Sequence, residues 1–222
     1  TGEAGQMREF TLNFPLYNGV RSLRVGISPT AELTAPTPFA VGQAILFYGS
    51  SITQGGCASR PGNAYTHILA RWFDANLINY GFSGSARAEQ EMARLIARIP
   101  MSVMVYDYDH NAPNIEPLAK THTPFFQTIR AARPELPVVM VSRPDFDRDL
   151  AESRARRKII HTTYEQAKAA GDQHVYFVDG ETLFGANDRD ACTVDGCHPN
   201  DLGFMRMAEG VRPALGQALG GE

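Results

Sequence analysis

Apolar and polar residues follow two different patterns along the chain, and the pattern changes near residue 43. From residue 44 on, short apolar runs alternate with longer segments of helical composition. The runs predict five buried strands, at 44–49, 76–81, 102–108, 137–142 and 174–180. The segments between and after them predict helices at 64–75, 86–98, 115–132, 149–170 and 200–218. Strands that alternate with helices indicate an α/β fold, with a parallel sheet covered by helices on both faces.

The first 43 residues lack this alternation. Two runs, 8–13 and 21–27, predict short strands separated by a turn-like Tyr-Asn-Gly at 17–19. Forty residues with two strands cannot bury a core of their own. We therefore divide the chain into an N-terminal β segment, residues 1–43, and a main domain, residues 44–222.

The amino-acid composition argues against several classes of protein. Of the 222 residues, 43% are hydrophobic and 20% are charged, which is typical of a soluble globular chain. The net charge of -3 argues against a protein that coats nucleic acid. No apolar stretch approaches the ~20 residues that span a bilayer, so we expect no membrane insertion. The first ten residues lack the basic and apolar regions of a signal peptide, although a signal already removed would leave no trace.

In a parallel sheet, functional residues lie in loops at the carboxyl ends of the strands. The first such loop, 49–56, holds Ser50 and Ser51 where a strand turns toward a helix. Hydroxyl groups there can cap the helix, and a phosphate loop is a weaker alternative because the lysine of that motif is missing. The G-x-S-x-G elbow of α/β-hydrolases is also absent, because Thr53 replaces its second glycine.

Three later loops add further candidate groups. Gly84 lacks a side chain, so its backbone N–H can approach a ligand closely. The loop from Asp107 to Pro113 offers Asn111 as an amide donor. We predict no metal site among its Asp and His residues, because Asp107 and Asp109 would share one face of the strand while His110 faces the other way. Before the last helix, Asp195 and His198 have the spacing in which a carboxylate can orient the imidazole of a base.

Taken together, these loops carry a complete set of groups for acyl transfer. A serine can act as nucleophile, a histidine with its aspartate as base, and Gly84 and Asn111 as donors to an oxyanion. All four loops are expected at one edge of one sheet.

The same motifs resemble those of the SGNH hydrolases, the GDSL-type esterase superfamily, over residues 44–218. Gly-Ser-Ser-Ile-Thr at 49–53 is similar to the G-D-S-[LI] block, which places Ser51 as nucleophile. Asn-Tyr-Gly-Phe-Ser-Gly at 79–84 and His-Asn at 110–111 resemble the blocks that carry the oxyanion glycine and asparagine. Asp-Gly-Cys-His-Pro at 195–199 resembles the D-x-x-H-P block. The chain departs from the family where Ser50, Asp109 and Ala112 replace an Asp, a Gly and an Asp.

This resemblance implies a flavodoxin-like three-layer α/β/α sandwich with a five-stranded parallel sheet. It implies a serine esterase with the triad Ser51, His198 and Asp195, and with an oxyanion hole from Ser51, Gly84 and Asn111. No cofactor or metal is expected. The expected substrate is a short-chain acyl ester, with carbohydrate O-acetyl groups favoured by family analogy; alternatives are a thioesterase, a lysophospholipase or a binding module without turnover. The resemblance also suggests that residues 1–43 are the end or remnant of a β-sandwich.

Other residues leave alternatives open. Arg60, Tyr108 and His110 are candidates for contacts with a small-molecule or glycan ester. The basic run 154–158 is interpreted as a solvated helix face. If the loops of Ser51 and His198 meet, Cys57 can reach Cys192 or Cys197. Such a bridge would favour a secreted or periplasmic location over the cytoplasm, whereas three free thiols would leave the compartment undetermined, as the oligomeric state is.

Overall fold

The computed structural model describes residues 6–221, and its centre is a five-stranded sheet in which every strand is parallel to its neighbours. The strand order is β2-β1-β3-β4-β5. The strands are β1 (Val41–Gly49), β2 (Ala75–Gly81), β3 (Val103–Asp107), β4 (Val138–Val141) and β5 (Val175–Val178). This arrangement confirms the predicted α/β class and five-stranded parallel sheet.

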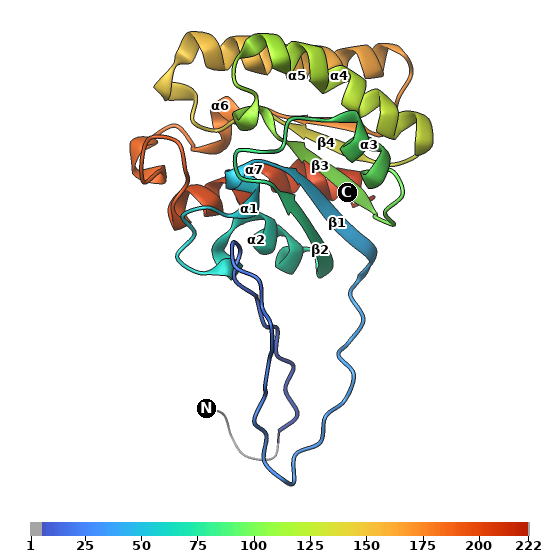
Figure 1. Cartoon of the computed structure of the whole chain (residues 1–222), viewed down its shortest axis with the longest axis vertical. Helices are drawn as coiled ribbons and strands as arrows, with labels where there is room; N and C mark the ends of the chain where they lie inside the picture. Colours follow the sequence, from blue (N-terminus) through green and yellow to red (C-terminus); the bar gives the residue numbers. More distant parts are fainter. Residues whose placement is uncertain (1–5, 222) are drawn as a thin grey trace.

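Helices cover both faces of the sheet and complete three layers (Figure 1). One apolar cluster joins alternate residues of β1, such as Ile45 and Phe47, to α2 and α7. The other joins Leu46 and Tyr48 to α3, α4 and α5. The helices are α1 (Ser51–Gln54), α2 (Tyr65–Trp72), α3 (Gln90–Ile96), α4 (Ile115–Ala132), α5 (Leu150–Ala169), α6 (Gly180–Leu183) and α7 (Asp201–Ala218), with short 3₁₀ turns at Pro61–Asn63, Asp109–Asn111, Phe146–Arg148 and Asp190–Cys192.

The register of the sheet brings three loops to one edge. Gly49, the last residue of β1, pairs with Gly81 of β2 on one side and with Asp107 of β3 on the other. The three strands therefore end at the same level. The connection after β1 leads to β2 and the connection after β2 crosses to β3 on the opposite side of β1, which is the kind of position where α/β sheets bind ligands.

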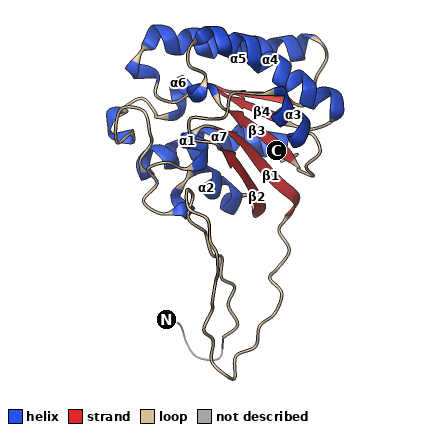
Figure 2. Ribbon diagram, in the orientation of Figure 1, coloured by secondary structure: helices blue, strands red, loops and turns tan. Residues whose placement is uncertain are grey.

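The N-terminal part differs from the prediction. Residues 6–40 form an arm without strands, drawn as loop in Figure 2, which projects from the body and returns to β1. The expected strands 8–13 and 21–27 are therefore absent. No backbone hydrogen bond within residues 6–40 pairs the two runs, and their apolar residues stay exposed, for example Phe10 at 87% and Val25 at 71%. Apolar alternation predicts a strand only where a partner strand and a covering layer exist.

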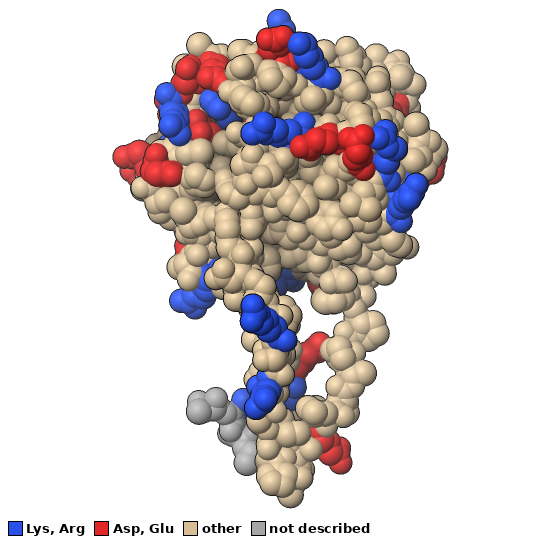
Figure 3. Space-filling model, viewed as in Figure 1, with Lys and Arg blue, Asp and Glu red and all other residues tan. Residues whose placement is uncertain are grey.

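The last features of the fold are the distribution of surface charge and the hydropathy of the helices. Basic and acidic side chains are interspersed over the body in the view of Figure 3. Among the described residues, no helix combines the length and the apolar character needed to cross a bilayer.

Candidate active site

Three of the predicted side chains meet at the carboxyl edge of the sheet. Ser51 is the first residue of α1, directly after β1, and His198 lies in the loop before α7. The Oγ atom of Ser51 is 2.9 Å from Nε2 of His198. On the other side of the ring, Nδ1 of His198 is 2.7 Å from Oδ2 of Asp195. These two hydrogen bonds form a continuous chain from the Ser51 hydroxyl through the imidazole of His198 to the carboxylate of Asp195.

The carboxylate of Asp195 determines which nitrogen of the His198 ring is left unprotonated in the neutral ring. Hydrogen bonds from the backbone N–H and the ring of His198 lower the pKa of Asp195 to about 2, so the group is ionised near neutral pH. An ionised carboxylate only accepts, so Nδ1 of His198 donates to it. In the neutral ring, Nε2 is then unprotonated and accepts the hydrogen of Ser51.

Local sequence explains the sharp turn that carries Ser51. Ser50 caps α1, because its Oγ accepts from the backbone N–H of Ile52 at 3.1 Å. Gly55 ends the single helical turn with a φ of 103°, which favours glycine. A Cβ atom on Gly49 would overlap Thr53, and one on Gly81 would overlap the backbone of Gln54. The two glycines let α1 lie directly against the strand ends.

The loop that carries His198 is held by its own backbone. Oδ1 of Asp195 accepts from the N–H groups of Cys197 at 3.0 Å and His198 at 2.7 Å. Thr193 and Pro199 pair in an antiparallel bridge that closes the loop at its base. The same aspartate therefore shapes the turn with one oxygen and orients the imidazole with the other.

The nucleophile loop and the histidine loop are also tied to each other. Asp201, at the start of α7, accepts from the backbone N–H of Ser59 at 2.9 Å and from Nδ2 of Asn63 at 2.8 Å. Both donors belong to the loop that follows α1. This link holds the serine and histidine loops at a constant separation.

Two further loops border Ser51. Nδ2 of Asn111 donates to the carbonyl oxygen of Phe82 at 2.8 Å, so the asparagine lies against the loop that contains Gly84. Gly84 has a φ of 69° and open space where a side chain would be. Oε1 of Gln54 accepts from the N–H of Ser83 at 3.0 Å and connects α1 to the same loop. The arrangement can chemically supply a serine nucleophile, a histidine base and nearby polar donors.

The predicted contact residues Tyr108 and Arg60 differ in their surroundings. Tyr108 is 1% exposed, stacks on Tyr106 at 5.2 Å between ring centroids, and bonds Thr121 through its hydroxyl at 2.6 Å. This core position differs from the expected place in a substrate pocket. Arg60 is exposed on the loop after α1, as a contact residue would have to be.

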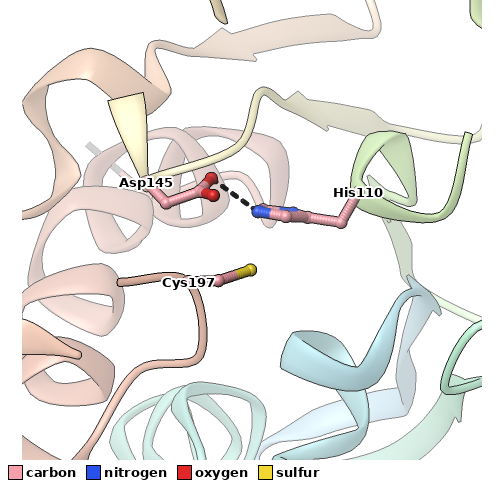
Figure 4. A group of neighbouring side chains, drawn as sticks. All are labelled: His110, Asp145 and Cys197. Atoms are coloured by element: carbon pink, nitrogen blue, oxygen red, sulfur yellow. Dashed lines mark hydrogen bonds and ion pairs between the residues drawn. The ribbon is translucent and has the colours of Figure 1, made fainter. Parts of the chain in front are cut away.

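His110 is buried in a cluster of charged groups instead of facing solvent. Its Nε2 atom is 2.7 Å from Oδ1 of Asp145, and Cys197 points toward the pair from the histidine loop (Figure 4). Burial alone would lower the pKa of His110, but the negative charge of Asp145 raises it well above the usual value. The hydrogen bond between His110 and Asp145 links two loops, and this position differs from the predicted substrate contact.

Two sets of side chains have donor atoms close enough to hold a metal ion. Ligand atoms of His110, Asp145 and Cys197 lie within 4.8 Å of one another, as do those of Asp107, Asp109 and His110. Imidazole, carboxylate and thiolate are ligands that Zn²⁺ accepts. Acyl transfer by a serine–histidine–aspartate triad, the chemistry predicted from the sequence, requires no metal ion.

Sequence reasoning missed the charged residues beneath the site. Asp107 accepts from the hydroxyl groups of Tyr65 at 2.7 Å and Thr53 at 3.1 Å. Arg156 is only 3% exposed and donates to the carbonyl oxygens of Asp109 and Ala112. The interpretation of run 154–158 as a solvated face is therefore wrong at Arg156. The signal available was its spacing, because it repeats at i, i+4 with the buried Ile160.

All three cysteines lie in the described part of the chain, and all three are free thiols. Cys57 is exposed, whereas Cys192 is buried with its Sγ atom near the carbonyl oxygens of Phe184 and Asp188. The structure thus contains neither of the Cys57 bridges considered from the sequence, and offers no argument for an oxidising compartment.

Known proteins of similar sequence and fold identify the family of the chain. The profile of the GDSL-like Lipase/Acylhydrolase family matches residues 42–216. A GDSL-like lipase from Bacteroides ovatus has 32% identity and a TM-score of 0.82, covering 94% of this chain and 62% of its own. The salicylyl-acyltransferase SsfX3 of a tetracycline biosynthetic pathway has 24% identity and a TM-score of 0.69, with 80% and 55% covered.

A third structure, a family two carbohydrate esterase from Clostridium thermocellum in complex with cellohexaose, has 19% identity and a TM-score of 0.66. It covers 85% of this chain and 67% of its own. The chain thus spans about three fifths of the length of the first two structures. No curated protein sequence matches the chain significantly. The family match over most of the chain shows that the protein belongs to the GDSL-like lipase/acylhydrolase family.

Proposed function

We propose that the protein is a serine esterase that hydrolyses short-chain acyl esters, with O-acetyl groups of carbohydrates as the substrate class. The hydrogen-bonded chain from Ser51 through His198 to Asp195 is the observation that carries the proposal. In this scheme Ser51 is the nucleophile, His198 the base, and Asp195 the group that orients the ring.

The reaction proceeds in two steps, acylation of Ser51 and hydrolysis of the acyl-enzyme. Nε2 of His198 accepts the Ser51 proton while Oγ attacks the ester carbonyl carbon, and the carbonyl oxygen becomes an oxyanion. His198 then returns the proton to the leaving alcohol, which leaves an acyl group on Ser51. Water, deprotonated by the same imidazole, releases the acid and restores the hydroxyl.

We assign the oxyanion to three donors. They are the backbone N–H groups of Ser51 and Gly84 and the side-chain amide of Asn111. The contact of Asn111 with Phe82 and the open space beside Gly84 support this assignment, because Asn111 lies against the loop that contains Gly84. Loss of one such donor costs roughly 10²–10³-fold in rate.

The substrate class takes support from the surroundings of the site and from proteins of similar fold. Ser83 and Ser85 are exposed on the loop that contains Gly84, and Arg60 is exposed on the loop after α1. Polar side chains on these two loops suit a hydroxyl-rich substrate. Structures of similar fold include the cellohexaose-bound esterase and a two-domain esterase active on acetylated mannans. A carbohydrate acetyl ester would present a small acyl group and a polar alcohol.

The proposal is tested with two neighbouring serines. Ser51→Ala should lower the hydrolysis of p-nitrophenyl acetate by about 10³-fold or more, because the nucleophile is lost. Ser50→Ala is the matched control: it removes a helix cap worth about 1 kcal/mol and should keep activity of the wild-type order. Initial rates and circular dichroism at one temperature provide the measurement.

Labelling and chelation complete the test. A p-nitrophenyl phosphonate should modify Ser51 in the wild type, as peptide mass spectrometry would show, and a chelator should leave the rate unchanged. A folded wild type that neither turns over the ester nor reacts with the phosphonate would indicate a binding module instead. Activity lost in chelator would contradict the metal-free scheme.

A further inference from the structure

The tip of the N-terminal arm is docked on the nucleophile loop. Leu16 alone among residues 6–40 is not exposed. Its carbonyl oxygen accepts from Nε2 of Gln54 at 3.1 Å. Its side chain fills the space over Gly55, where an added Cβ atom would overlap Leu16 and approach Ala64 to 2.8 Å. Asn13 also lies close to Gly62 of the loop after α1, whereas residues 18–40 are exposed, so this contact with the body belongs to the region of the tip.

Gln54 joins this tip to the proposed oxyanion side of the site. The same side chain that donates to Leu16 accepts from the backbone N–H of Ser83. Gln54 is also the last residue of α1, the turn that begins with Ser51. One side chain thus fixes the arm tip, the nucleophile turn and the Gly84 loop relative to each other.

Tyr17 is the residue that this docking brings to the catalytic groups. Its hydroxyl donates to the carbonyl oxygen of Ser51 at 3.4 Å. A Cβ atom placed on Gly56 would lie 2.8 Å from that hydroxyl and 3.7 Å from Cδ2 of His198. The phenol hydroxyl and the imidazole therefore both lie near Gly56, and 52% of the surface of Tyr17 is exposed.

The position of Tyr17 relative to His198 indicates which half of the substrate it meets. In the proposed reaction the leaving oxygen takes its proton from His198, so the alcohol must lie on the histidine side of Ser51. Gly84 and Asn111, the proposed oxyanion donors, belong to other loops. Tyrosine offers a flat apolar ring and a polar hydroxyl, which suit a ring-shaped or hydroxylated alcohol.

We propose that Tyr17, carried by the arm tip, is a substrate-binding residue that recognises the alcohol half of the ester. This inference rests on the proposed esterase function. It makes the arm part of the active site, since a segment from outside the sheet would supply one wall. Recognition of the alcohol would then depend on residues at the start of the chain.

The test compares two acetates that differ only in the alcohol. Tyr17→Ala should raise KM for 2-naphthyl acetate by about 3–10-fold, the worth of one aromatic contact, while KM for methyl acetate changes by less than about twofold. The kcat values should stay close to wild type. Tyr17→Phe keeps the ring and should show the smaller effect. Tyr176→Phe removes a hydroxyl 3.5 Å from the carbonyl oxygen of Gln217 and is the matched control.

The possible results distinguish a failure of the Tyr17 inference from a failure of the proposed esterase function. Equal changes for both acetates, or a change in kcat alone, would show that Tyr17 only supports the nucleophile loop and would overturn the inference. A wild type inactive on both acetates would overturn the esterase proposal and this inference together. Thermal unfolding of each variant verifies that the comparison is made between folded proteins.

Discussion

Asp107 is a carboxyl group buried directly under the nucleophile turn. It is 1% exposed, and its Oδ1 atom has no hydrogen-bond partner among the described residues. Burial raises its pKa to about 7, although the hydrogen bond from Tyr65 acts in the opposite direction. In the unfolded chain the same group has its ordinary, lower pKa. The folded protein therefore holds a proton that the unfolded chain releases between roughly pH 4 and pH 7.

This difference makes a testable stability prediction. As pH rises through that window, Asp107 favours the unfolded chain, so the wild type loses stability relative to Asp107→Asn. The gap should be small at pH 4 and grow by on the order of 3 kcal/mol by pH 7.5. Urea unfolding of both proteins across the range measures it. The exposed Asp190→Asn should show no such trend, and a gap independent of pH for Asp107→Asn would contradict the assignment.

At this scale, sequence reasoning succeeds where chemistry is local. Asp195 and His198 are close in sequence, and their turn and spacing are visible without the fold. The partners of His110 and Asp107 cannot be recognised without the fold, because Asp145 and Tyr65 come from distant segments. Tyr108 was misplaced for a related reason: a residue just beyond a strand end can turn inward or outward, and only the packing of Tyr106 and α4 decides it.

At the scale of elements, helix α5 supports the loop that carries Asn111. Nη1 of Arg156 donates to the carbonyl oxygen of Asp109 at 2.7 Å and Nη2 to that of Ala112 at 3.0 Å. These carbonyl groups flank Asn111 on both sides. Glu152, one turn earlier on α5, pairs with the guanidinium at 2.7 Å. The forked shape of arginine suits two acceptors at once, which lysine cannot match.

Arg156→Lys should therefore weaken catalysis more than binding. We expect kcat to fall by about tenfold, below the roughly 10²–10³-fold cost of losing an oxyanion donor outright, with KM nearly unchanged. Stability should drop by about 1–3 kcal/mol, because a buried carbonyl loses its donor. Steady-state kinetics well below the unfolding temperature separate the two effects. Arg154→Lys, exposed on the same helix, is the control; a wild-type kcat in Arg156→Lys would exclude this role.

The elements of the body were largely predictable. All five strands and the five longer helices form where apolar periodicity placed them, with ends that shift by a few residues. The short turns α1 and α6 were not predicted as helices, because four residues carry too little periodicity. The arm was misread because alternation alone does not supply a partner strand.

In the whole molecule, the arm and the body differ sharply in how far their residues are exposed to solvent. Residues 19–40 are exposed throughout, while residues 41–49 already belong to β1 of the sheet. The body begins slightly before the boundary expected at 44. That residues 1–43 form the end of a β-sandwich stays a prediction, and such packing would cover the exposed Phe10, Leu12, Leu23 and Val25.

Brief digestion with trypsin should therefore cut first at Arg21 or Arg24 and leave the body intact. Proteases need an exposed segment that can open locally, and the arm offers one without disturbing the sheet. Mass spectrometry of the early fragments identifies the sites. The double variant Arg21→Gln, Arg24→Gln should slow this first cut. Initial cleavage inside residues 41–218 would show that the arm is better protected than its exposure indicates.

The contact between Ser51 and His198 joins residues 147 positions apart. During synthesis the serine leaves the ribosome early, whereas the histidine loop and α7 come among the last segments of the body. A nascent or truncated chain that ends before His198 has a serine hydroxyl without a base to activate it. In the proposed scheme such a chain cannot hydrolyse esters, so turnover begins only once nearly the whole body has been made and folded.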